Sequence, residues 1–362
     1  MQIDVFDFFS GCGGTSCGFR DAGFNIKMGL DIDHDSAETF RLNFPSSAFI
    51  EADIRDVKPE DISHLINHNL PTLFCGCAPC QPFSKQNRHK NKDDKRLDLL
   101  DEFGRFVKYW MPDFVFIENV PGMQLKAAKS ETFQRFTELL SGLGYNYRTK
   151  VVEAQSYGVP QKRSRLILLA ALKQEISLPE PTHGKDIRPF SSIRDWIGDL
   201  PPIAHGNVDS HDEDHFCMKL SETNFNRIRA TPEGGGREHW PDHLMLACHR
   251  GYTGHVDVYG RMSWDKPAVG LTTKCISYSN GRFGHPTQDR AISLREAACL
   301  QTFPRTFKFI GSKTSRARQV GNAVPPLMAA RVANSIKEAI SHRALASEDA
   351  SNSTISSRRP RA

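Results

Sequence analysis

The sequence predicts an α/β protein with a doubly wound, mostly parallel sheet and a smaller, loop-rich second domain. Three observations predict this fold class. In the first half of the chain, short runs rich in Phe, Val and Ile alternate with segments of helical periodicity. Most of these runs are apolar on both faces, which is typical of parallel strands covered by helices on both sides. The chain has 362 residues, which is enough for one large domain or two.

Five strands are expected in order, in residues 3–9, 25–33, 48–54, 72–78 and 113–120. Helical spacing lies between them, in "SCGFRDAG", "HDSAETFRLNF" and "RLDLLDEFGRFVKYW". A sixth unit joins an extended segment to another apolar strand, residues 166–171. The carboxyl ends of parallel strands meet at one edge of the sheet, so residues that follow the strands are expected to converge there.

The character of the sequence changes after residue 172. Residues 179–290 carry Pro-Pro, Gly-Gly-Gly and many histidines, and they have few periodic segments. A Ser293–Glu296 capping box then predicts a helix start, and residues 324–341 have an amphipathic helical pattern. We therefore expect a first domain in residues 1–172, completed by 319–343, a second domain in 173–318, and a disordered Ser-rich tail in 344–362.

Composition limits the class of protein. The formal net charge of +5 makes an anionic partner plausible. Nine cysteines in a chain of this length do not form a disulfide scaffold, and reduced thiols in a cytoplasm are the default. No signal peptide and no membrane span are expected, because the first residues are not basic and no apolar run approaches about 20 residues.

Three consecutive strand ends describe a nucleoside pocket. The first strand runs into "DFFSGCGGTSCGF", a Gly-rich turn and helix start that suits an anion or nucleotide but lacks the Gly-Lys-Ser/Thr of a triphosphate-binding loop. The second strand ends in Asp31 and Asp33, where an acid can bind ribose hydroxyls. The third places Asp53 beside Ile54, an acid and an apolar side chain that suit the amine and the face of an adenine.

Reactive groups follow the next strands at the same edge. Cys80, in "PCQPFS", comes after the fourth strand, and from the residues alone it is a buried thiol, a metal ligand or a nucleophile. Glu118 directly follows the apolar run "FVFI" of the fifth strand. Desolvating a carboxylate there is costly, so we expect Glu118 to be paired with another group or to have a function. Arg163 and Arg165 occupy alternate positions of "QKRSR", so both point to one face if the segment is extended.

Together, "DFFSGCGG", "PCQPFS", "ENV", "QKRSR" and "VGNAVPP" resemble the motifs of the DNA cytosine-5-methyltransferases, in the same order from Asp7 to about Pro326. The resemblance implies the Rossmann-like fold of S-adenosylmethionine-dependent methyltransferases and a target-recognition role for the second domain. It implies that Cys80 is the nucleophile that adds to carbon 6 of a flipped-out cytosine, that Glu118 contacts the base, and that Arg163 and Arg165 assist there. S-adenosylmethionine would be held by Phe9, Gly11, Gly13, Asp31, Ile32, Asp53, Ile54, Pro79 and Asn322.

The resemblance also implies a partner, double-stranded DNA. The run after Cys80 is basic, and its expected DNA contacts are Gln81, Ser84, Arg88 and Arg96. The family usually has an Arg-Gly pair near Arg96, whereas Leu97 follows here, so the hinge of this loop is expected to differ. In the second domain the expected contacts are Arg261, Arg282 and Arg290. We expect a monomeric prokaryotic restriction-modification enzyme, with a cognate endonuclease acting separately.

Three other interpretations were weighed. Cys75, Cys77 and Cys80 form a Cys-x-Cys-x-x-Cys run, but a zinc or iron–sulfur site needs a fourth ligand, so no metal is expected. The related RNA cytosine methyltransferases carry a Cys-Phe-Thr run where this chain reads "LTTKCISYSNGRFGHP", which favours DNA. An inactive DNA-binding relative would be expected to lack Cys80 or Glu118, and both are present.

Overall fold

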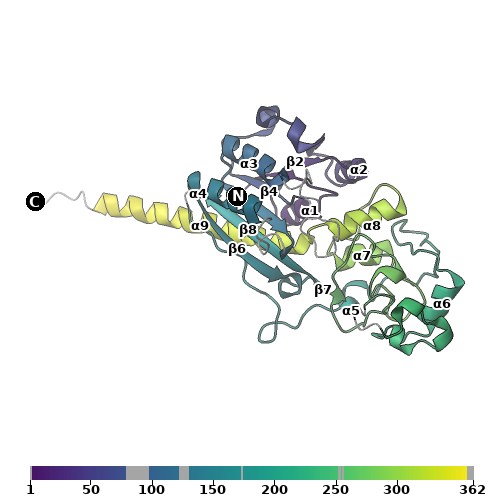
Figure 1. Cartoon of the computed structure of the whole chain (residues 1–362). Coiled ribbons are helices and arrows are strands. Elements are labelled where there is room, and N and C mark those ends of the chain that lie inside the picture. The colour runs from purple at the N-terminus through teal and green to yellow at the C-terminus, as the bar shows by residue number, and fades with distance from the viewer. Residues whose placement is uncertain are drawn as a thin grey trace, which may run out of the picture.

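The protein has two lobes, of which the larger is built on a seven-stranded sheet (Figure 1). The computed structural model describes residues 2–78, 98–121, 130–172, 174–251, 254 and 257–356, with side chains up to residue 341. The strand order is β3-β2-β1-β4-β5-β8-β6. Neighbouring strands from β3 to β5 pair in parallel, and β8 runs antiparallel to both β5 and β6.

The predicted α/β fold class is confirmed, and each predicted strand has a counterpart in the sheet. The strands are β1 Asp4–Phe8, β2 Asn25–Asp31, β3 Ala48–Glu51, β4 Thr72–Gly76, β5 Phe114–Asn119, β6 Tyr145–Glu153 and β8 Ser164–Leu172. A separate two-stranded ladder pairs β7 Gln161–Lys162 with β9 Ala268–Val269, and it links the larger lobe to the smaller one.

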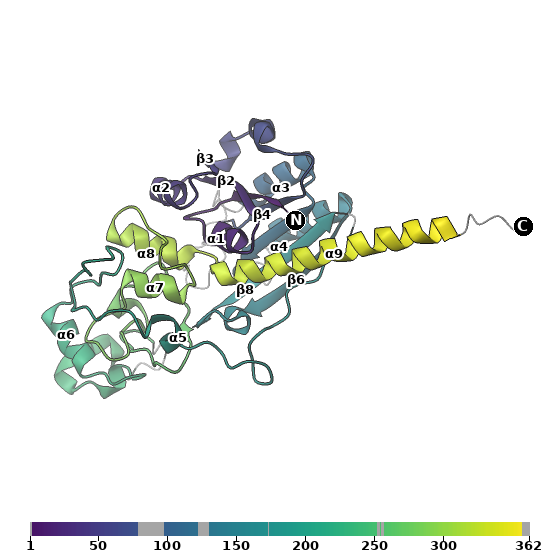
Figure 2. The same cartoon turned by 180° about the vertical axis from the view of Figure 1, so that it is seen from behind.

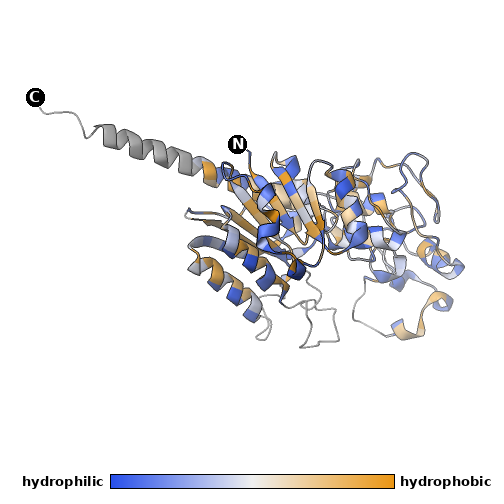
Figure 3. Cartoon of the chain, turned by 90° about the horizontal axis from the view of Figure 1, so that it is seen from above, coloured by the Kyte–Doolittle hydropathy of each residue, from blue (hydrophilic) through white to orange (hydrophobic). Residues whose placement is uncertain are grey.

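Helices cover both faces of the sheet, as its two-sided apolar strands require. On one face, α1 (Gly14–Asp21), α2 (His34–Asn43) and α9 (Pro326–Ser356) pack on alternate strand residues such as Val5 and Cys75. On the other face, α3 (Leu99–Trp110) and α4 (Ser130–Gly142) pack on Phe6 and Phe74. Figure 3 shows the same pattern as apolar strands between helices that are apolar on one side.

The smaller lobe is built from short helices and loops. Its helices are α5 Ile193–Ile197, α6 Glu222–Arg229 and α7 Leu294–Leu300, with α8 Lys313–Asn322 where the lobes meet. Short 3-10 turns complete the two lobes: η1 Ile54–Asp56, η2 Pro59–Leu65, η5 Ala154–Tyr157, η6 Arg237–His239, η7 Asp242–Leu244, η8 Ala247–His249 and η9 Tyr278–Asn280. The predicted Ser293–Glu296 capping box is present at the start of α7.

The C-terminal helix is longer than the sequence pattern predicted. It continues to Ser356 and projects beyond the sheet, whereas a disordered tail was expected from residue 344 (Figure 2). Residues 344–356 contain neither Gly nor Pro, so no residue type that breaks helices interrupts the backbone there. Within the described ranges, no helix is both long and apolar enough to cross a membrane.

Candidate active site

A Gly-rich turn connects β1 to α1 and forms the floor of the site. Phe9, Gly11 and Gly13 all have positive φ angles, of 58°, 52° and 92°. At Gly13 a Cβ atom would lie 2.5 Å from the ring of Phe44, so both the backbone angle and the packing require glycine. A Cβ on Gly14 would lie 2.5 Å from the carbonyl oxygen of Val324, so the first turn of α1 packs closely on the segment that leads into α9.

Asp31, the last residue of β2, holds this turn in place. Its Oδ2 accepts a hydrogen bond from the Gly11 N–H at 2.8 Å, and its Oδ1 accepts one from the Asp33 N–H at 2.9 Å. Burial raises the pKa of Asp31, while the two backbone donors partly oppose that shift. The carboxylate is therefore fixed in direction by the backbone on either side of it.

A cavity of about 370 Å³ opens above the turn at the carboxyl edge of the sheet. The strand ends supply part of its lining, including Cys77 and Ala78 after β4 and Glu118 from β5. Across from them, α8 and the residues after it supply the other wall. Five of the predicted cofactor and catalytic residues line this one cavity: Phe9, Gly11, Asp31, Glu118 and Asn322.

The other predicted cofactor residues within the described ranges, Gly13, Ile32, Asp53 and Ile54, do not line this cavity. Ile32 is 68% exposed at the end of β2. Ile54 is buried in the core that α3 covers. The Asp53 side chain caps η1 and bonds the Arg55 guanidinium, which lowers the pKa of Asp53. Pro79 lies outside the described residues.

Glu118 and Arg165 meet where β5 ends and β8 begins. The Nε of Arg165 lies 2.7 Å from the Oε1 of Glu118, and both side chains are largely buried. The antiparallel register, which pairs Glu118 with Ile167, brings the two together. Next to them, Asn119 Nδ2 donates to the Ala78 carbonyl at 3.1 Å and so ties the end of β4 to the end of β5.

Arg163 is placed differently from Arg165. It is 5% exposed, and it donates to the carbonyl oxygens of Leu271, Gly321 and Ala323 at 3.1, 3.0 and 3.3 Å. Of the two arginines expected at the base, the structure therefore brings Arg165 to Glu118 and directs Arg163 to backbone carbonyls of other segments.

The predicted nucleophile and the basic run after it lie outside the described residues. These are Cys80 and the expected DNA contacts Gln81, Ser84, Arg88 and Arg96. Ala78, two residues before Cys80 in the sequence, lines the cavity together with Glu118.

The three arginines expected to contact DNA in the smaller lobe are bonded inside it. Arg290 is fully buried, and its two terminal nitrogens bond Glu296 at 2.7 and 2.6 Å. Arg261 is 4% exposed and donates to backbone carbonyls of four other residues, beside an ion pair with Asp289.

Arg282 bonds Asp257 and the carbonyls of Gly234 and Gly235. Each of the three guanidinium groups thus has protein partners in the smaller lobe, and their contact with DNA stays a prediction.

Comparison with known proteins shows the family of this chain. The family described as C-5 cytosine-specific DNA methylase matches residues 3–338. The chain belongs to the C-5 cytosine-specific DNA methylases. The Type II methylase M.HgiDII of Herpetosiphon aurantiacus is 39% identical over 92% of this chain and 94% of its own length. The Type II methyltransferase M1.HphI of Haemophilus parahaemolyticus is 34% identical over 93% of this chain and 87% of its own length.

Solved structures agree with the fold of this methylase. A chain described as a DNA modification methyltransferase encoded within a prophage (E. coli) has a TM-score of 0.74 at 25% identity, covering 94% of this chain and 99% of its own. Larger relatives also match: DNA (cytosine-5)-methyltransferase 3 of Arabidopsis thaliana is 29% identical over 94% of this chain, which spans 31% of the plant protein. The predicted family and enzyme class are confirmed.

Two residues of the methylase cavity were missed by sequence reasoning. Arg318 and Gln319 line it from α8, and Arg318 forms an ion pair of 2.8 Å with Asp33 on the opposite wall. A helical reading of "RQVGN" would have found them, because residues three and four before Asn322 share its face of a helix.

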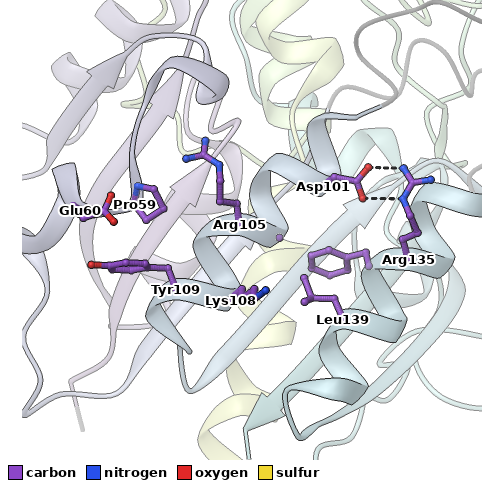
Figure 4. Close-up of a pocket in the computed structure, with 10 residues that line it drawn as sticks. Pro59, Glu60, Asp101, Arg105, Lys108, Tyr109, Arg135 and Leu139 are labelled. Atoms are coloured by element: carbon purple, nitrogen blue, oxygen red, sulfur yellow. Dashed lines mark hydrogen bonds and ion pairs between the residues drawn. The ribbon is translucent and has the colours of Figure 1, made fainter.

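A larger hollow of about 790 Å³ lies elsewhere on the methylase, between η2, α3 and α4 (Figure 4). None of the predicted site residues lines it. Two of its basic side chains already form ion pairs, Arg135 with Asp101 and Arg105 with Glu102. The predicted site residues therefore gather at the smaller cavity at the strand ends and not at this hollow.

Proposed function

We propose that the protein transfers the methyl group of S-adenosylmethionine to carbon 5 of a cytosine flipped out of a specific duplex sequence, through a covalent adduct of Cys80 at carbon 6. One observation carries the proposal: four of the predicted cofactor residues, Phe9, Gly11, Asp31 and Asn322, line the same cavity as Glu118, and Ala78, two residues before Cys80 in the sequence, lines it too.

The residues of the cavity fit the proposed cofactor. The Asp31 carboxylate, oriented by two backbone N–H groups, is an acceptor suited to ribose hydroxyls. The Gly-rich turn brings backbone close to a ligand at the start of α1, and a cavity of about 370 Å³ is within the usual size of a small-molecule site. When bound, S-adenosylmethionine supplies an electrophilic methyl group on its sulfonium.

Covalent catalysis is needed because carbon 5 of cytosine is a poor nucleophile. The deprotonated Cys80 sulfur adds to carbon 6, and the electron pair of the 5,6 double bond becomes available at carbon 5 to take the methyl group. Removal of the carbon 5 proton by water then restores the double bond and expels the thiolate. No side chain is assigned as the base for that proton.

Glu118 and Arg165 would stabilise the charge that this addition places on the ring. The Glu118 carboxyl group would donate its proton to N3 and accept a hydrogen bond from the exocyclic amine, and Arg165 would donate to O2, so the two side chains would face the atoms where negative charge develops. Their 2.7 Å contact supports this assignment, because each partner limits the orientation of the other before the base arrives. The family resemblance supports the same two roles.

Target recognition is proposed for the smaller lobe, with the duplex between the two lobes. The base must leave the stack before its carbon 6 can reach a thiol, and this costs a few kcal/mol that protein contacts offset. The names of the Type II relatives support a restriction-modification role, in which a cognate endonuclease would act on the same sequence.

Methylation of a plasmid in a host that lacks other cytosine methylases tests the proposal. Bisulfite sequencing should show 5-methylcytosine at one recurring sequence, and purified protein should transfer label from S-adenosylmethionine to that plasmid. Transfer to transfer RNA with none to duplex DNA would instead support the RNA methyltransferase alternative. Absence of label in both would contradict the proposal.

A further inference from the structure

A buried polar joint connects the cofactor cavity to the smaller lobe. Its side chains are Gln161, Arg163 and Gln301, of which Gln161 and Gln301 are completely buried. They come from the β7–β8 segment and from the residue after α7, and in Figure 1 β7 lies between the two lobes.

Arg163 is central to the joint because its guanidinium bonds backbone carbonyls of the smaller lobe and of the segment around the end of α8. Its Nη1 donates to Leu271, which follows β9 in the smaller lobe, and to Gly321 at the end of α8. Its Nη2 donates to Ala323. Asn322, which lines the cofactor cavity, stands between the two carbonyls of residues 321 and 323 that this guanidinium holds.

The two glutamines extend the same connection. Gln161 Oε1 accepts from the Leu271 N–H at 3.1 Å, and its Nε2 bonds the Gln301 side chain. Gln301 in turn donates to the Ala323 carbonyl. A movement of Leu271 or Ala323 would therefore leave buried donors or acceptors without partners, which is unfavourable because such groups have lost their hydrogen bonds to water.

Close packing restricts movement of the cavity wall relative to the smaller lobe. A Cβ on Gly321 would lie 2.2 Å from the carbonyl oxygen of Thr272, so the cavity wall touches the smaller lobe directly. Burial and hydrogen bonding thus join the wall that contacts the cofactor to the lobe proposed to contact DNA.

We propose that Arg163 is a positioning residue that couples occupancy of the cofactor cavity to the placement of the smaller lobe on DNA, so that the two ligands strengthen each other's binding. This inference rests on the proposed function, because it takes S-adenosylmethionine and duplex DNA as the ligands. It assigns Arg163 no contact with the reacting base. The coupling is reciprocal, as linkage requires.

The test measures DNA binding by fluorescence anisotropy on the full-length protein, with a labelled duplex carrying the mapped target sequence. The Kd is determined without and with saturating S-adenosylhomocysteine, which fills the cavity without reacting. For the unsubstituted protein, we expect about a 5-fold or larger tightening of the Kd, within the usual range of coupling between sites.

In Arg163→Lys the tightening should fall to less than about 2-fold, because one ammonium nitrogen cannot replace the two terminal nitrogens that hold the three carbonyls. The Kd of S-adenosylhomocysteine without DNA should stay within about 3-fold, since Arg163 does not line the cavity. Lys162→Gln, an exposed neighbour in β7, is the matched control and should keep the full tightening.

Two results would overturn the inference: an unsubstituted protein that binds both ligands without coupling, or an Arg163→Lys variant that keeps the full effect. If Arg163→Lys does not fold by circular dichroism, Gln301→Met, which removes the bond to Ala323, should show partial loss of coupling. Unchanged coupling in that variant would also reject the inference. Failure of the unsubstituted protein to bind either ligand would instead count against the proposed function.

Discussion

Glu118 and Arg165 face each other at the junction of two antiparallel strands, largely shielded from water. A carboxylate and a guanidinium lie 2.7 Å apart here, although an apolar pair of the same volume would be no less stable in many proteins. The role that we propose for both groups at the base, and not stability, accounts for this pair.

Replacing Arg165 by Ala should lower kcat by about 100-fold or more, as does the loss of a group that stabilises developing negative charge. The KM for S-adenosylmethionine should change little, because Arg165 does not line the cofactor cavity. Steady-state transfer of labelled methyl groups to duplex DNA measures both values.

Arg148→Ala is the control for Arg165→Ala, because Arg148 is an exposed arginine of the same sheet that pairs only with the exposed Glu175 among the described ion pairs. It should leave kcat unchanged. A kcat for Arg165→Ala within about 3-fold of the unsubstituted value would remove Arg165 from the proposed mechanism.

Asp7, beneath the Gly-rich turn, makes stability depend on pH. Burial raises the pKa of Asp7 from 3.8 to about 7, although the Ser16 hydroxyl that donates to its Oδ2 partly opposes the shift. Between these two pH values the folded protein keeps a proton that the unfolded chain has lost. This group's contribution to stability therefore falls as the pH rises from about 4 to about 7, and then stays low.

Asp7→Asn keeps the shape of the side chain but cannot ionise. Thermal unfolding between pH 5 and pH 8, in overlapping buffers, should show a smaller fall in Tm for this variant than for the unsubstituted protein. Because Asp31 also has a raised pKa, part of the fall should remain. Equal slopes for the two proteins would show that Asp7 does not titrate in this range.

At the scale of secondary-structure elements, the smaller lobe relies on buried ion pairs where the larger lobe relies on its sheet. Arg290 and Glu296 are both buried, and together they anchor the start of α7. Burial alone would raise the pKa of Glu296, but the bonds and charge of Arg290 outweigh it and lower the pKa to about 2.

Arg290→Ala should therefore destabilise the protein by about 3–5 kcal/mol, because it leaves a buried carboxylate without its partner. Chemical denaturation measures this loss, and the double variant Arg290→Met with Glu296→Gln should recover part of it. If Arg290 instead contacts DNA, Arg290→Ala would keep its stability and reduce the salt dependence of DNA binding. The structure predicts the first result.

Strand patterns predicted the elements of the larger lobe better than those of the smaller one. β5 begins with the continuous apolar run FVFI, and the ends of β2 and β5 place Asp31 and Glu118 at one edge of the sheet. The reversed direction of β8 has no such signal, because an apolar run reads alike in both directions. In the smaller lobe, a buried arginine and a DNA-contacting arginine look the same in the sequence, since only tertiary contacts decide which one is paired.

At the scale of the whole molecule, the function depends on segments that are distant in the chain. Arg163 reaches Gly321, which lies 158 residues later, and Arg318 reaches Asp33 across 285 residues. The motif "QKRSR" predicted a role at the base for both of its arginines, and that role stays a prediction. Its pattern could not show that Arg163 bonds the wall of the cofactor cavity, because that wall is completed by the returning C-terminal segment.

The proposed methyl transfer depends on a transient bond between the Cys80 sulfur and carbon 6 of cytosine. A duplex with 5-fluorocytosine at the mapped target position tests it most directly, because fluorine in place of the carbon 5 proton blocks the elimination that frees the thiol. With S-adenosylmethionine, the unsubstituted protein should form a complex with this duplex that survives denaturing electrophoresis, and Cys80→Ser should form none. A protein that methylates the ordinary duplex but never becomes attached to the fluorinated one would contradict the account.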